Sequence, residues 1–174
     1  RTGGTNALRA RGRKWATAGV SGDLVKGAGP VLLARFLTGD SAVEVMCGLA
    51  AVLGSSRSIF LRFGGGRGVA TGVGTMLVIQ PLAVFLAAPV FIVAILVTRY
   101  VSLGSLLGSA AMIPAMLLIW AVFQGDLPPI YLAYTAAGAA LIWLAHADNI
   151  DRLLHGRERK LDFGLFGGGD PSAG

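Results

Sequence analysis

Six long apolar passages, separated by short polar connections, constrain this chain more than any other feature of its sequence. They run near residues 16–37, 41–55, 69–79, 81–98, 103–123 and 129–147. Several of them approach the roughly 20 apolar residues that a helix needs to cross the hydrocarbon core of a bilayer. Because lipid offers the backbone no hydrogen-bond partners, these passages are expected to be helices. The sequence therefore predicts an all-α, polytopic membrane helix bundle, folded as a single integral membrane domain over residues 1–174.

Two of the passages are shorter than a membrane crossing requires. At about 1.5 Å per residue, a helix over 69–79 would span roughly half of a 30 Å hydrocarbon core. The passage at 41–55 is also short, and the two flank a segment that contains Gly64-Gly65-Gly66. Non-helical backbone at membrane depth requires protein or a polar cavity around it. We therefore expect a re-entrant-like glycine loop between two short helices.

Positive charge is distributed unevenly among the connections. Arginine and lysine gather in segments 1–15, 56–68, 99–102 and 148–174, and the alternate connections lack them. This asymmetry predicts that the four basic segments are cytosolic. Arg35 is the exception, near the outer end of the first passage, where we expect its side chain to snorkel. Nucleic acid is not an expected partner despite the net charge of +6, because aromatic residues do not interleave with the basic ones.

The glycine-rich segment before Val69 is a candidate anion site. Its glycines allow successive backbone N–H groups to converge on an anion, and the helix that follows adds its positive N-terminal end. Arg67 can add a forked pair of donors to a phosphate. The alternative is a flexible loop whose arginines only set topology. Gly68-x-x-x-Gly72 and Gly104-x-x-x-Gly108 are interpreted more simply as notches for helix packing.

His146, Asn149 and Arg152 recur every third residue, so a helix would align them along one side. This pattern predicts a polar site, although a histidine at the end of a membrane helix can also be an interfacial cap. His155 is the only other histidine, and no carboxylate–histidine cluster accompanies the pair. No metal site is expected.

Asp23 and Lys26 lie inside the first apolar passage, where charges are costly and are usually paired or functional. Two interpretations remain open: an ion pair between residues three apart on one helix, or a lysine that faces a cavity.

The three polar segments, in this order between these passages, resemble the acyl-phosphate:glycerol-3-phosphate acyltransferases of bacteria (the PlsY family). The family's first motif ends in Gly-x-Thr-Asn and a following arginine, and its second resembles Gly-Gly-Lys-Gly-Val-Ala-Thr. Its third resembles His-x-x-Asn-Ile-x-Arg-Leu-x-x-Gly-x-Glu. The residues that match these motifs and the connecting Asp-x-x-Lys-Gly are Gly3, Thr5, Asn6, Arg9, Asp23, Lys26, Gly27, Gly65, Gly66, Gly68–Thr71, His146, Asn149, Ile150, Arg152, Leu153, Gly156 and Glu158, with Arg99–Leu103 also similar.

The chain differs from the family at several positions. Arg67 replaces a lysine, Gly64 replaces a basic residue, and Ser55 stands where the family usually has histidine. The family has seven passages, and the sequence starts at Arg1 rather than at a methionine. We therefore expect that the family's N-terminal helix and the Gly-Ser-Gly-Asn after it are missing here, with Arg1 where that Asn would stand.

The resemblance implies an enzyme that transfers a fatty acyl group from acyl-phosphate to the 1-hydroxyl of glycerol-3-phosphate, giving lysophosphatidic acid and phosphate. It implies a bacterial plasma membrane protein without a cofactor, whose partners are both substrates, the bilayer and, as a candidate, the enzyme that makes acyl-phosphate. It assigns His146 and Asn149 to catalysis. Its substrate- and phosphate-binding residues would be Thr5, Asn6, Arg9, Lys26, Gly65, Gly66, Arg67, Gly68, Thr71, Ser102, Arg152 and Glu158.

This chemistry needs little from the protein beyond positioning. Acyl-phosphate is a mixed anhydride with a good leaving group, so orientation and charge neutralisation can supply most of the catalysis. The hydroxyl proton would pass to the substrate's phosphate or to His146, and the apolar passages would hold the acyl chain. The alternative is a small transporter or assembly subunit for an anionic solute. We favour the enzyme because the sequence has no evident internal repeat and its polar segments share one face.

Overall fold

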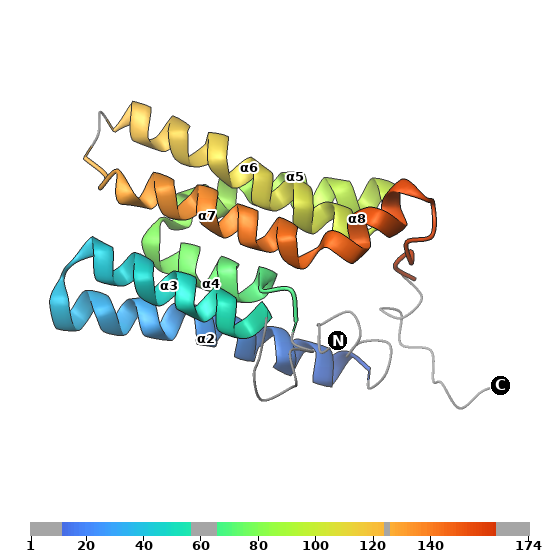
Figure 1. Cartoon of the computed structure of the whole chain (residues 1–174), viewed down its shortest axis with the longest axis horizontal. Coiled ribbons are helices and arrows are strands. Elements are labelled where there is room, and N and C mark those ends of the chain that lie inside the picture. The colour runs from blue at the N-terminus through green and yellow to red at the C-terminus, as the bar shows by residue number, and fades with distance from the viewer. Residues whose placement is uncertain (1–11, 57–65, 124–125, 163–174) are drawn as a thin grey trace.

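The computed structural model describes residues 12–56, 66–123 and 126–162, and this part of the chain is almost entirely helical. Figure 1 shows the longer helices packed side by side with their axes roughly aligned, while the short last helix turns away from them. Each of the six expected passages contains a helix, which confirms the all-α bundle. The helices are α2 (Arg13–Thr38), α3 (Ser41–Ser56), α4 (Val69–Ile79), α5 (Pro81–Thr98), α6 (Val101–Val122), α7 (Ile130–Ala145) and α8 (Ala147–Leu154).

Tight turns connect the helices at the two ends of the bundle. Gly39 adopts φ 62° and its N–H donates to the carbonyl of Arg35, which ends α2 with a left-handed cap. Pro81 begins α5 directly after Gln80, because proline has no N–H to lose in the first helical turn. In Figure 1 the turns at 39–40 and at Gln80 lie at the left end, whereas the start of α2, the α5–α6 connection and α8 lie at the right end.

The helices differ in their fitness to cross a membrane. Within the described residues, α5 and α6 are long and apolar enough, and α7 with α8 forms a third candidate that is bent by 62°. The helices α3 and α4 are apolar but shorter, as expected on both sides of the glycine segment. Large apolar side chains such as Phe85 and Val97 are 68% and 77% exposed. Such outward apolar faces are typical of contact with lipid.

Glycines allow the closest helix contacts. A Cβ added to Gly27 of α2 would clash with the carbonyl oxygen of Thr71, and one added to Gly74 of α4 would clash with that of Leu24. At these two points α2 and α4 are too close for any larger residue. In the same way, a Cβ on Gly104 would meet Ile95 Cγ1 at 2.7 Å. The predicted notch at Gly104-x-x-x-Gly108 is therefore a contact between α5 and α6.

An ion pair with a buried carboxylate and a partly exposed guanidinium joins four helices at the end of the bundle near Gly39. Glu44 is only 3% exposed, and it accepts hydrogen bonds from Arg35 Nε at 3.1 Å, Arg35 Nη2 at 2.7 Å and the Tyr131 hydroxyl at 3.0 Å. Arg35 Nη1 also donates to the carbonyl of Val78 at 2.8 Å. A carboxylate on the next helix therefore neutralises the charge of Arg35, and the expectation that its side chain snorkels stays a prediction. Sequence reasoning overlooked Glu44, which supplies this carboxylate.

We expect Glu44→Ala to destabilise the protein by about 3 kcal/mol, because it leaves the Arg35 guanidinium without its carboxylate in a partly buried position. The measurement is the free energy of unfolding, or the thermal midpoint, in detergent. A double variant, Arg35→Met with Glu44→Leu, should recover much of the loss by removing both charges. Equal stability of Glu44→Ala and the unmodified protein would show that the pair is dispensable.

Candidate active site

The chain changes direction sharply at His146. Helix α7 ends at Ala145, α8 begins at Ala147, and the two are bent by 62°. His146 is 1% exposed, and its Nδ1 lies 2.8 Å from the carbonyl oxygen of Ile142. Because a carbonyl can only accept, Nδ1 carries a proton, and in the neutral form of the ring Nε2 is the nitrogen that can accept. His146 is also the N-cap of α8, and its carbonyl accepts hydrogen bonds from the N–H groups of Asn149 and Ile150. The predicted alignment of His146 with Asn149 and Arg152 along one side stays a prediction.

The carboxylate of Glu158 brings three of the predicted site residues together. Gly156 adopts φ 65° just beyond α8, so the chain can turn back along that helix. Glu158 then accepts hydrogen bonds from Asn149 Nδ2 at 2.8 Å, Arg152 Nε at 2.8 Å and Ser102 Oγ at 3.1 Å. The N–H of Leu161 donates to the carbonyl of Arg99 at 2.7 Å, which fixes the following residues against the α5–α6 connection. We call Ser102, Asn149, Arg152 and Glu158 the Glu158 cluster.

The other residues of the Glu158 cluster lower the pKa of the Glu158 carboxyl group. Burial of the side chain works to raise the pKa of Glu158, but the hydrogen bonds from Asn149, Arg152 and Ser102 and the charge of Arg152 outweigh it. The pKa of Glu158 is therefore below its ordinary value of 4.5. An ionised carboxylate cannot donate a hydrogen bond to phosphate. In this geometry, Glu158 instead orients three hydrogen-bond donors. Its predicted contact with substrate stays a prediction.

The side-chain oxygen of Asn149 is a hydrogen-bond acceptor without a partner among the described residues. Its side chain is 1% exposed, and its Oδ1 has no hydrogen-bond partner among the described residues. The Glu158 carboxylate must be met by the Asn149 NH₂ group, so the orientation of the amide is fixed and Oδ1 is directed away from Glu158. A buried carbonyl oxygen without a partner is costly in a folded protein and is a natural acceptor for a substrate hydroxyl.

The glycine segment leads into α4 as expected. Gly68 adopts φ 72° immediately before Val69, and both Gly66 and Arg67 are partly buried beside it. Thr71 is fully buried, and its hydroxyl donates to Ser55 Oγ at 2.8 Å. Thr71 thus holds α3 to α4, and its predicted contact with phosphate stays a prediction.

The other predicted binding residues are not part of the Glu158 cluster. Lys26 is 70% exposed and pairs with Asp23 at 3.0 Å, which favours the ion-pair interpretation over the cavity-facing one. Thr5, Asn6, Arg9 and Gly65 lie outside the described residues. In the part of the chain that the structure describes, no group of three or more His, Cys, Asp or Glu side chains could hold a metal.

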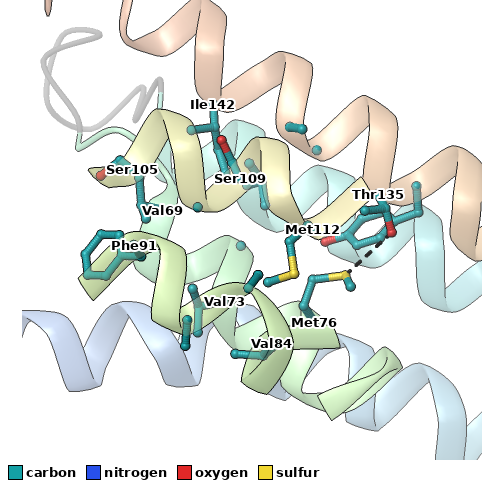
Figure 2. Close-up of a pocket in the computed structure, with 18 residues that line it drawn as sticks. Val69, Val73, Met76, Val84, Phe91, Ser105, Ser109, Met112, Thr135 and Ile142 are labelled. Carbon is teal, nitrogen blue, oxygen red and sulfur yellow. Dashed lines mark hydrogen bonds between the residues drawn. The ribbon is translucent and has the colours of Figure 1, made fainter. Parts of the chain in front are cut away.

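An apolar cavity of about 250 Å³ lies between α4, α5, α6 and α7, next to the site (Figure 2). Val69, Ser105 and Ile142 line it. Val69 follows Gly68, Ser105 is one turn beyond Ser102, and Ile142 is one turn before His146. The cavity therefore begins where the polar site residues end.

The hydroxyls in the cavity wall do not make it polar. Ser105 Oγ donates to the carbonyl of Val101, Ser109 Oγ to that of Leu106, and Thr135 Oγ1 to that of Tyr131. These hydroxyls are satisfied within their own helices, so the wall suits an aliphatic occupant. The sequence predicted that apolar passages would hold an acyl chain but could not locate the cavity. The only signal was its small residues, Gly72, Gly108 and Gly138, which resemble ordinary packing notches.

Comparison with known proteins gives a consistent result. A family model described as glycerol-3-phosphate acyltransferase matches residues 1–156. A glycerol-3-phosphate acyltransferase 3 of Dehalococcoides mccartyi is 40% identical over 174 aligned residues, which cover 93% of this chain and 80% of the relative. A glycerol-3-phosphate acyltransferase of Trichlorobacter lovleyi is 42% identical over 158 residues, covering 91% and 78%.

Two solved structures share the fold. The crystal structure of PlsY (YgiH), an integral membrane glycerol 3-phosphate acyltransferase, in its glycerol 3-phosphate form superposes with a TM-score of 0.83 at 34% identity. The match covers 96% of this chain and 81% of that one. The lysophosphatidic acid form gives a TM-score of 0.81 at 35% identity, covering 92% and 79%.

The lowered pKa of Glu158 predicts how stability depends on pH. A depressed carboxyl pKa stabilises the fold above the unfolded value of 4.5, and that contribution is lost as pH falls through the folded pKa. Thermal midpoints of the unmodified protein and of Glu158→Gln, measured in detergent between about pH 3 and pH 7, should differ most at the upper end. Their difference should shrink below pH 4.5. A difference that is constant with pH would mean that the charge of Glu158 contributes nothing.

Proposed function

The chain belongs to the glycerol-3-phosphate acyltransferase family of multi-pass integral membrane proteins, and on that premise we propose how it acts. It transfers a fatty acyl group to glycerol-3-phosphate and so forms lysophosphatidic acid. The acyl donor is acyl-phosphate, and the second product is inorganic phosphate. The observation that carries this proposal is the polar Glu158 cluster bordering an apolar cavity, an arrangement suited to substrates that are charged at one end and aliphatic at the other.

Arg152 is suited to bind phosphate. Among the described residues it donates only through Nε, to Glu158, so the two terminal guanidinium nitrogens remain to donate to an anion. The side chain is 36% exposed, which leaves it open to a soluble substrate. A guanidinium fixed by a carboxylate on one side presents a forked pair of donors on the other. Arg67, Gly66 and Gly68 at the start of α4 provide the donors for the second phosphate.

Asn149 positions the nucleophile. Its unpartnered Oδ1 accepts the hydrogen bond of the 1-hydroxyl of bound glycerol-3-phosphate, which places the hydroxyl oxygen near the acyl carbon before reaction. As the new bond forms, the hydroxyl turns its single proton from Oδ1 to the final acceptor. A bond forms between the hydroxyl oxygen and the carbonyl carbon, and the carbon–oxygen bond to phosphate breaks. Holding the two reacting atoms in this orientation supplies a large part of the rate enhancement.

The hydroxyl proton has two candidate acceptors. One is the phosphate of the substrate, which becomes a good base as it leaves. The other is Nε2 of His146, the ring nitrogen that does not carry the proton held by Ile142.

The acyl chain occupies the cavity between α4 and α7. Each methylene buried there contributes about 0.8 kcal/mol to binding. The site end of the bundle faces the cytosol of a bacterium, because the helix ends that adjoin the basic segments share that end and positive charge favours the cytosolic side. An enzyme that produces acyl-phosphate is then a suitable partner at this face.

The activity is tested directly with purified protein in detergent. Palmitoyl-phosphate and glycerol-3-phosphate should yield lysophosphatidic acid and phosphate in equal amounts, and EDTA should leave the rate unchanged. An obligatory requirement for acyl-coenzyme A, or loss of the rate in EDTA, would contradict the proposed donor or the metal-independent mechanism.

Substitutions of Asn149 and Arg152 should change different kinetic constants. Asn149→Ala removes the acceptor for the nucleophile and should lower kcat about 100-fold, equivalent to about 3 kcal/mol of transition-state stabilisation. Arg152→Ala should mainly raise the KM of a phosphate substrate, and added salt should reproduce part of that effect. Leu154→Ala is a suitable control, since Leu154 is 80% exposed on the same helix.

Normal kinetics in both variants would mean that α8 is only a cap on the membrane surface and takes no part in the reaction. His146→Gln resolves the proton acceptor in the same assay: a nearly normal kcat supports the substrate's phosphate, whereas a severe loss supports Nε2 of His146.

A further inference from the structure

We propose that Gly138, together with Met76 and Met112, determines the length of the acyl chain that this protein transfers. The inference rests on the proposed function and goes beyond it, because it assigns substrate selectivity to particular residues of the cavity wall. It follows from the depth of the cavity, from what closes it, and from the space around one glycine.

The cavity has two well-defined ends. Figure 2 shows the two groups of side chains at opposite ends of the cavity. The entrance ring consists of Val69, Phe91, Ser105 and Ile142, and the floor consists of Met76, Val84, Met112 and Thr135. On each of the four helices the entrance residue and the floor residue are seven positions apart, or about 10 Å of helix.

This depth is comparable with the length of a short acyl chain. An extended chain advances about 1.3 Å per methylene, given carbon–carbon bonds of about 1.5 Å and near-tetrahedral angles. The distance between entrance and floor therefore accommodates about eight methylenes. The turn from Ser102 to Ser105 adds about 4.5 Å, enough for roughly three or four more. A longer chain that stays within the cavity must displace the floor.

The floor is closed by the hydrophobic core. Met76 is 5% exposed, and its sulfur lies 4.0 Å from Thr135 Oγ1. Met76 belongs to the core cluster with Ile79 and Met116, and Met112 packs against that cluster. Methionine is flexible enough to yield partly to a ligand, so the floor resists longer chains without forbidding them.

Gly138 has an environment unlike that of the other glycines in the cavity wall. A Cβ on Gly108 would lie 3.0 Å from Phe91 Cβ, and one on Gly72 would lie 3.4 Å from Ile142 Cδ1. A Cβ on Gly138 would meet no heavy atom within 4 Å. Gly138 is therefore not required for close helix packing here, although glycine costs about 1 kcal/mol relative to alanine inside a helix. What its missing side chain provides is volume halfway along the cavity.

The test fills that volume. Gly138→Leu places a side chain in the cavity without a backbone clash, and Gly138→Ala is the smaller step. For each variant, kcat/KM is measured with octanoyl-, lauroyl- and palmitoyl-phosphate. The ratio of palmitoyl to octanoyl transfer should fall about tenfold or more in Gly138→Leu and by less in Gly138→Ala, since a single methylene in an apolar pocket changes selectivity by about tenfold or more.

Gly29→Leu is the matched control. Gly29 lies on α2, outside the cavity, and an added Cβ there also meets no heavy atom within 4 Å. Its chain-length ratio should equal that of the unmodified protein. Met112→Ala tests the opposite direction and covers the case in which Gly138→Leu does not fold. Deepening the floor should raise the ratio of stearoyl to lauroyl transfer.

The outcomes separate this inference from the proposed function. An active unmodified protein whose chain-length ratios are unchanged by folded Gly138→Leu, or by Met112→Ala, would overturn the assignment of Gly138 and the floor and leave the reaction intact. Failure of the unmodified protein to transfer from any acyl-phosphate would overturn the proposed donor, and this inference with it.

Discussion

The ion pair between Arg35 and Glu44 is the interaction on which the packing of the bundle depends. It places two opposite charges among apolar helices and satisfies them with Tyr131 and the carbonyl of Val78. Each partner comes from a different helix, so α2, α3, α4 and α7 must all be in register for the charges to be compensated. Apolar surface alone has no such directionality, because lipid tails are as apolar as the helix faces.

A second carboxylate plays the corresponding part at the other end. Glu158 orients Ser102, Asn149 and Arg152, and the rest of its segment is fixed to the carbonyl of Arg99. The two ends are functionally different: the Arg35–Glu44 network uses all of its charge internally, whereas the Glu158 cluster leaves guanidinium and amide atoms for a ligand. The apolar cavity runs from the second end toward the first and stops at the core.

Sequence reasoning predicted much of this arrangement and missed particular parts of it. Helix positions were predictable because a membrane requires every apolar passage to satisfy its own backbone. Asn149, Arg152 and Glu158 were identified as site residues, and they do lie together. The partner of Arg35 was not predicted, because Glu44 is nine positions away on another helix. The 62° bend at His146 was not predicted, because spacing in the sequence does not reveal where one helix ends and the next begins in a new direction.

By itself, then, the sequence determined the class of the protein, the positions of its apolar helices, and the family whose motifs it carries. These follow from local composition, since hydrophobicity and short motifs are properties of neighbouring residues. Only the tertiary structure decided that Glu158 orients three donors and that the exposed Lys26 pairs with Asp23. It also decided that Gly138 borders open space, whereas Gly27 and Gly74 lie at close contacts between α2 and α4. Those properties depend on which helix lies opposite each residue and at what distance, and the three-dimensional packing of the bundle fixes both.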